Sequence, residues 1–202
     1  MKGVFTLITR AFLLVMIPFF ASAQFTLRAG GTFSSLRIES NNSLPYEGLK
    51  RNYAGAYIGL GYQQSLGSTF HLVYSADYLQ RYMKSRVPYV AEANAKSLTH
   101  HYASVGVKAG VTLFSALHVR VGGVANVLLA SPNQTDWYRK SNAIEPLAVA
   151  ELGYSLGRLE LQAGYQHPLG AFSTMQPTSI DTRTFRFYNP SFYLGAAFKI
   201  KK

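Results

Sequence analysis

The sequence contains no cysteine, which excludes disulfide bonds, thiolate metal sites and cysteine nucleophiles. Charged residues are also scarce, because they make up 14% of the 202 residues, against about 25% in soluble globular domains. Acidic residues are the rarer kind, with 9 Asp and Glu against 20 Lys and Arg, which gives a net charge of +11. Beyond residue 20 there is no run of about 18 apolar residues, the length that a membrane-spanning helix needs.

The N-terminus has the pattern of a secretion signal. Lys2 and Arg10 are positively charged, residues 11–20 form an apolar run that is too short to cross a membrane, and 21–23 reads Ala-Ser-Ala, a small-residue cleavage site. The pattern predicts a signal peptide over 1–23, with cleavage between Ala23 and Gln24, and one mature domain over 24–202. A buried core helix is the alternative for the apolar run.

The mature part is dominated by stretches in which apolar and polar residues alternate, as they do along a strand with two different faces. In one of them, Leu117, Val119 and Val121 alternate with His118 and Arg120. We count eight such stretches, at residues 25–37, 53–65, 69–82, 99–113, 117–129, 146–156, 159–168 and 190–200. The connections between them are alternately long and short, which predicts an up-and-down arrangement.

Strand length distinguishes a soluble β-sandwich from a membrane barrel, because apolar and polar residues alternate along the strands of both folds. The stretches run about 10 to 15 residues, longer than the usual 5–6 of soluble sheets and long enough for a tilted membrane crossing. Their apolar faces carry no charge apart from Arg37 at one end. The sequence therefore predicts an all-β fold, an eight-stranded antiparallel up-and-down transmembrane β-barrel after a cleaved signal peptide.

Short turns and long loops then lie at opposite ends of the predicted barrel. An even number of strands places both termini with the short turns, on the periplasmic side of an outer membrane. The long loops 38–52, 83–98, 130–145 and 169–189 would face outside, and they are rich in Pro and Asn. The short connections predicted are 66–68, 114–116 and the dipeptide Gly157-Arg158, whose leading glycine fits a type II′ turn.

Charged residues on the polar face of the strands are the main candidate site. They would line an interior that side chains just fill, where an unpaired charge is costly. We therefore expect an interior polar network, in which Lys108 pairs with Asp77 and Glu151. A gated polar path for ions is the alternative interpretation. The residues concerned are Arg28, Asp77, Arg81, Lys108, Arg120, Glu151, Glu160 and Lys199.

Other residue types predict no catalytic, metal or cofactor site. His100 and His101 are adjacent, so on a strand they point to opposite faces and cannot share a metal ion. The glycines on the inward face do not lie in a strand-to-helix turn, which a phosphate-binding loop requires, and we interpret them as relief of crowding in a narrow barrel.

The segment around residue 141 resembles the active-site stretch of the outer-membrane lipid A deacylases. That family carries a His two residues before a Ser-Asn-Ala run, and the resemblance would make Ser141 a nucleophile. The run is present as Ser141-Asn142-Ala143, but Arg139 occupies the position of the catalytic base. The alternative is an ordinary exposed loop, and we expect no enzyme activity.

Taken whole, residues 24–202 resemble the outer-membrane β-barrels of Bacteroidota, the porin-family or PorT-like barrels, and are similar in build to the small OmpA and OmpX barrels. The resemblance is carried by the opening strand from Phe25 to Gly31 and the closing strand from Phe192 to Ile200. It implies a non-enzymatic integral barrel with a structural or surface-binding role, with a small low-conductance pore as the alternative.

The same resemblance implies the partners and the location of the chain. The partners would be outer-membrane lipids, lipopolysaccharide and the barrel-assembly machinery, with a surface ligand that the sequence does not identify. Nucleic acid is not expected as a partner, because the basic residues are scattered singly and the chain carries an export signal. Acidic lipid headgroups are the expected counter-charge.

Overall fold

The computed structural model describes residues 23–35, 37–40, 52–84, 97–130, 143–171, 173–175 and 184–200, and these residues form strands and turns. The long strands are β1 (Ala23–Ser35), β3 (Asn52–Leu66), β4 (Phe70–Lys84), β5 (Ser97–Leu113), β6 (Leu117–Ala130), β7 (Ile144–Leu156), β8 (Leu159–Pro168) and β11 (Ser191–Lys199). The short strands are β2 (Arg37–Ser40), β9 (Ser173–Met175) and β10 (Phe185–Tyr188). No helix in the described ranges has the length and hydropathy needed to cross a membrane.

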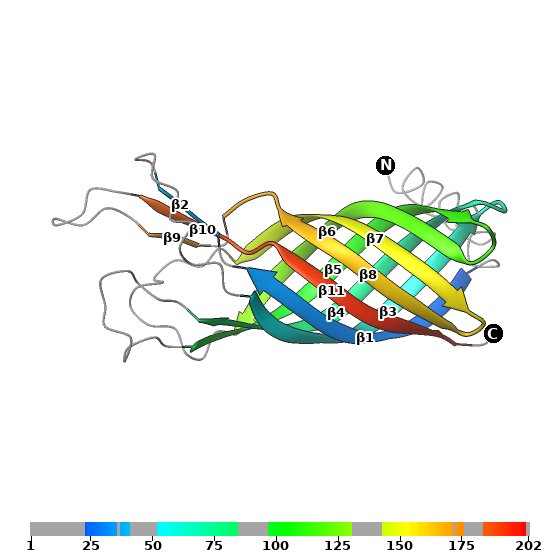
Figure 1. Ribbon diagram of the computed structural model, residues 1–202, viewed down its shortest axis with the longest axis horizontal. Helices are drawn as coiled ribbons and strands as arrows, with labels where there is room; N and C mark the ends of the chain where they lie inside the picture. The colour runs from blue at the N-terminus through cyan, green and yellow to red at the C-terminus, as the bar shows by residue number, and fades with distance from the viewer. Residues whose placement is uncertain are drawn as a thin grey trace, which may run out of the picture.

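The eight long strands close into one barrel (Figure 1). Each pairs with its sequence neighbour in antiparallel fashion, and β1 closes the ring by pairing with both β3 and β11. The predicted eight-stranded antiparallel up-and-down barrel is therefore confirmed. Residues 1–22 of the predicted signal peptide lie outside the described residues. Ala23 and Gln24, which flank the predicted cleavage site, form the start of β1.

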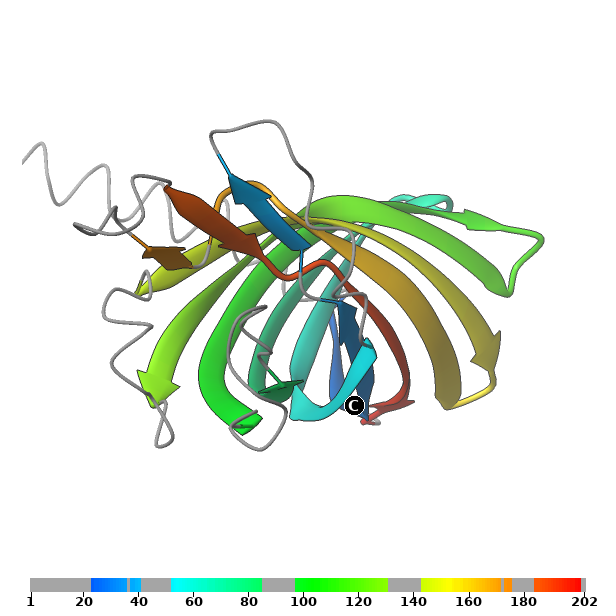
Figure 2. The same cartoon turned by 60° about the vertical axis from the view of Figure 1, so that its left-hand side comes forward.

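A second, smaller sheet was not foreseen. Strands β2, β10 and β9 pair in that order and extend beyond one end of the barrel (Figures 1 and 2). Residues 38–52 and 169–189 were expected to be plain loops, so the structure corrects both ranges. Arg37, expected at the end of the first barrel strand, belongs to β2 instead. We call this end of the barrel the loop side and the opposite end, with the short turns, the turn side.

The barrel is apolar outside and polar inside. Leu60, Val121 and Leu194 on the outer face are 56%, 59% and 56% exposed, whereas Arg81 and Arg120 on the inner face are 0% and 1% exposed. A water-soluble protein buries its apolar side chains, so this inverted pattern is stable only where the outer face is in contact with lipid. The alternation in the sequence thus reflects two environments. Apolar residues face lipid outside the barrel, and polar residues face the closely packed interior.

Two of the three predicted turns are found where expected. Leu113 pairs with Leu117 around residues 114–116, and Leu156 pairs with Leu159 around Gly157, whose φ is 65°. The turn between β3 and β4 was placed one residue too early, because Leu66 pairs with Phe70 and the turn is 67–69. In both placements of the turn, the two residues that flank it lie on the same face of the sheet. The alternation of faces therefore could not distinguish a turn at 66–68 from one at 67–69. Gly67, with φ 93°, takes the left-handed position in the turn.

The β5–β6 turn adopts left-handed backbone angles without glycine. Ser115 has φ 62°, a conformation that costs an ordinary residue about 1 kcal/mol or more. Replacing Ser115 with glycine is therefore expected to raise the free energy of unfolding by about 1 kcal/mol, measured by urea titration in lipid vesicles. Ser68→Gly is the control, because Ser68 also lies in a short turn but does not itself have a positive φ. Equal effects of the two substitutions would show that backbone strain at Ser115 is not the cause.

Candidate functional site: the polar interior of the barrel

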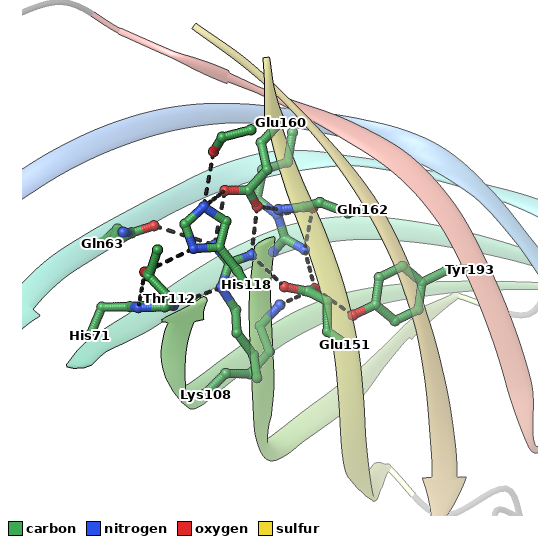
Figure 3. Close-up of polar contacts among 12 residues, drawn as sticks. Gln63, His71, Lys108, Thr112, His118, Glu151, Glu160, Gln162 and Tyr193 are labelled. Atoms are coloured by element: carbon green, nitrogen blue, oxygen red, sulfur yellow. Dashed lines mark hydrogen bonds and ion pairs between the residues drawn. The ribbon is translucent and has the colours of Figure 1, made fainter. Parts of the chain in front are cut away.

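The interior charges gather midway along the barrel in one cluster, drawn from six different strands. We call it the central cluster; it consists of Arg28 (β1), Asp77 (β4), Lys108 (β5), Arg120 (β6), Glu151 (β7) and Glu160 (β8). Three cations face three carboxylates, so the formal charges cancel. In Figure 3, Lys108 and Tyr193 point toward Glu151, and His118 and Gln162 point toward Glu160.

Arg120 is the most extensively bonded cation of the cluster. Its guanidinium donates to Glu160 through Nη1 at 2.5 Å and Nη2 at 2.9 Å, and Nη1 also lies 2.8 Å from Glu151 Oε1. Its Nε donates to His71 Nε2 at 3.0 Å. This side chain uses both edges of its planar fork, which is the geometry that makes arginine suited to buried carboxylates.

Glu151 is the carboxylate on which all three cations of the cluster converge. Its Oε2 lies 2.5 Å from Lys108 Nζ and 3.7 Å from Arg28 Nη2, and its Oε1 accepts from Arg120. The Tyr193 hydroxyl also donates to Oε2, at 2.5 Å (Figure 3). Since the side chain of Glu151 is fully buried, its charge is stable only with these partners.

Asp77 pairs with Arg28 at 3.1 Å, and not with Lys108 as the sequence led us to expect. The register explains the difference, because Arg28 and Asp77 are both partners of Gly59, on opposite sides of β3. Glycine leaves no side chain between them, so the two charges meet across the strand. Gly153 plays the same part on β7, where an added Cβ would lie 2.9 Å from Glu160 Oε1 and 3.0 Å from Arg120 Nη1.

A second charged layer lies nearer the loop side. Arg81 donates to Glu145 at 2.8 Å and to Gln166 at 2.8 Å, and Asn126 donates to Glu145 at 3.1 Å. Sequence reasoning missed Glu145, because it assigned residues 130–145 to a loop. The structure corrects that range, since β7 begins at Ile144. The signal was present, because apolar Ile144 and polar Glu145 lie in phase with Ala150 and Glu151 of the same strand.

The turn side of the interior holds a chain of hydrogen-bonded polar side chains. His118 contacts Thr112 Oγ1 at 3.0 Å through Nδ1 and Ser155 Oγ at 2.9 Å through Nε2 (Figure 3). Lys199, one of the residues selected from the sequence, donates to the same Ser155 oxygen at 2.9 Å. The structure therefore places Lys199 in this chain and away from the carboxylates of the central cluster.

One small cavity lies in the described part of the interior. A cavity of about 30 Å³ lies on the loop side of the central cluster, lined by Asp77, Lys108 and Thr32 among others. A water molecule needs about 10–15 Å³ on this measure, so the cavity holds about two. The charges and the packed Tyr57, Leu79 and Tyr193 occupy the lumen at this level of the barrel.

No metal-type cluster of three or more His, Cys, Asp or Glu side chains occurs among the described residues. His100 is buried, at 1% exposure, whereas His101 is hydrogen-bonded to Tyr78 on the outer face. The two histidines do point to opposite faces. Arg139, Ser141 and Asn142, which carry the resemblance to lipid A deacylases, lie outside the described residues.

Comparison with known proteins identifies the fold but no family. No protein-family model matches the chain, and no curated protein matches it significantly. Neisserial surface protein A is similar in structure, with 13% identity, coverage of 88% of this chain and 99% of that chain, and a TM-score of 0.51. The outer membrane protein OprG from Pseudomonas aeruginosa has 7% identity, coverage of 90% and 97%, and a TM-score of 0.53. The chain thus has the fold of small outer-membrane β-barrels.

Proposed function

We propose that this chain is an integral outer-membrane β-barrel that performs no catalysis and serves as a rigid scaffold for external segments with a structural or surface-binding role. The observation that carries the proposal is the filled interior. Six charges pair across the lumen, and the free space beside them holds about two water molecules. A barrel that is closed in this way offers its outer face to lipid and its loop side to partners.

The topology supports a proposed orientation in the membrane. The start of β1, the end of β11 and the short turns lie at one end of the barrel, and in outer-membrane barrels that end faces the periplasm. The long connections between the barrel strands, 36–51, 85–96, 131–143 and 169–190, would then face outside. The partners proposed are outer-membrane lipids, lipopolysaccharide and the barrel-assembly machinery, and the proposed relationship is to the porin-family barrels of Bacteroidota.

A small pore is the competing function, and planar-bilayer conductance separates the two. The purified protein is expected to produce no resolvable channels, because an ion crossing the lumen would have to displace the Arg120–Glu160 and Lys108–Glu151 pairs. A general porin that is reconstituted in the same way provides the positive control. Reproducible unitary steps from the folded barrel would contradict the scaffold proposal.

Surface display is tested with the same protein in intact cells. An epitope placed within 83–98 is expected to bind antibody without permeabilisation, and an epitope at the C-terminus only after it. The opposite pattern would reverse the proposed orientation.

A further inference from the structure

The three short turns at the turn side differ in chemistry. The β3–β4 turn reads Gly67-Ser68-Thr69, and the β7–β8 turn reads Gly157-Arg158, so each offers polar or charged groups to its surroundings. The β5–β6 turn reads Phe114-Ser115-Ala116 and contains no charged residue. One rim of the barrel therefore carries a cation in one turn and an aromatic ring in another.

Phe114 projects from the β5–β6 turn almost without contact. Its side chain is 91% exposed, more than the other exposed large apolar residues among the described ones. Its φ is 50° and that of Ser115 is 62°, so two consecutive non-glycine residues adopt the left-handed conformation. Such backbone angles persist only where the surroundings or a function maintain them. A tight β-hairpin turn requires such positive φ angles at its central residues, so the pairing of β5 with β6 maintains them here and holds the Phe114 ring outward.

The apolar surface of the outer face runs without interruption into this turn. Leu113 and Leu117 form the last pair of β5 and β6, and Val121, further along β6, is 59% exposed on the same face. Phe114 extends that surface beyond the last strand pair. Figure 2 shows the β5–β6 hairpin, in green, ending in its turn at the turn side of the barrel. The continuity favours a lipid surface as the occupant, because a pocket in a protein partner would not require it.

We propose that the β5–β6 turn is inserted into the membrane, with Phe114 among the acyl chains of the periplasmic leaflet, while the β7–β8 turn with Arg158 stays in water. The rim of the barrel then lies at unequal depths, which a tilt of the barrel axis would produce. This inference rests on the proposed location of the outer face in lipid, and it adds which part of the rim lies deepest.

Depth-dependent quenching of tryptophan fluorescence tests the proposal. The chain has a single Trp, Trp137, so Trp137→Phe gives a background without tryptophan. Into this background go Phe114→Trp, Ser68→Trp and Arg158→Trp, each reconstituted into phosphatidylcholine vesicles with bromine at the 6,7 positions of the acyl chain. We expect quenching at position 114 to be at least twofold stronger than at positions 68 and 158. Equal quenching at the three positions would overturn the proposal and favour a protein partner for Phe114.

A variant in the middle of the apolar surface tests the location of the outer face in lipid separately from the insertion of the β5–β6 turn. Val121→Trp is expected to be strongly quenched wherever the outer face lies in lipid, so a lack of quenching there would overturn the proposed location itself. Should Phe114→Trp fail to fold, Phe114→Cys labelled with an environment-sensitive fluorophore replaces it, with Ser68→Cys as its control. The absence of native cysteine makes both labels specific. Emission at position 114 no bluer than at position 68 would overturn the proposal.

Discussion

Replacing Glu151 with leucine is expected to lower the free energy of unfolding of the barrel by about 3–5 kcal/mol, the cost of removing one partner of a buried ion pair. The substitution would leave Lys108 without its carboxylate, and it would take from Arg120 and Arg28 the charge that they share. The Tyr193 hydroxyl would lose its acceptor as well. Urea unfolding in lipid vesicles, followed by circular dichroism and by gel mobility of the unheated protein, measures the loss.

Lys108→Met is the matched comparison and is expected to cost less, about 1–3 kcal/mol. Glu151 would keep Arg120 at 2.8 Å and Arg28 at 3.7 Å. Asp77 would keep Arg28 at 3.1 Å. The order of the two losses distinguishes a cluster centred on Glu151 from the simple pairing of Lys108 with two carboxylates that the sequence led us to expect. A Lys108→Met protein as unstable as Glu151→Leu would favour the simpler pairing.

The architecture could be predicted from the sequence because the two faces of each strand differ in polarity, which produces a local alternation of apolar and polar residues. The period of two in a segment such as 117–129 needs no knowledge of distant residues. The strand pairs of an up-and-down barrel are almost all sequence neighbours, so the short turns also fix most of the register. Where two registers gave the same face pattern, as around Gly67, the sequence could not choose between them.

The partners inside the barrel could not be predicted, because they depend on closure of the ring and on side-chain reach. Arg28 and Asp77 meet because β1 lies beside β3 and because Gly59 is between them. The up-and-down arrangement predicts that these strands are neighbours, but the register that pairs Arg28 with Gly59 is set across a long connection and does not follow from the local sequence. The β2–β10 pair is equally remote, since it joins the segment after β1 to the segment before β11. Short strands of four residues leave too little alternation to be recognised.

The structure assigns a specific role to one of the inward glycines, Gly164, which leaves room for the Tyr193 ring. Gly164 lies directly opposite Tyr193 in the β8–β11 register. An added Cβ there would overlap the Tyr193 ring, with the phenolic oxygen at 2.5 Å. Since that oxygen also donates to Glu151, the missing side chain at Gly164 positions a hydrogen bond of the central cluster. The packing at Gly164 and the hydrogen bond to Glu151 therefore both depend on the position of the Tyr193 ring.

Gly164→Ala is accordingly expected to lower the free energy of unfolding by about 1–3 kcal/mol, the usual cost of overpacking, because Tyr193 must move away from Glu151. Gly31→Ala is the control, since its Cβ would meet nothing closer than the Gly55 carbonyl oxygen at 3.7 Å. The double variant Gly164→Ala/Tyr193→Ala is expected to be no less stable than Tyr193→Ala alone, because the ring that the new methyl group would strike is gone. Urea titration of the four proteins measures the coupling. Additive losses in the double variant would place the cost of Gly164→Ala in the backbone and not in the ring that holds Glu151.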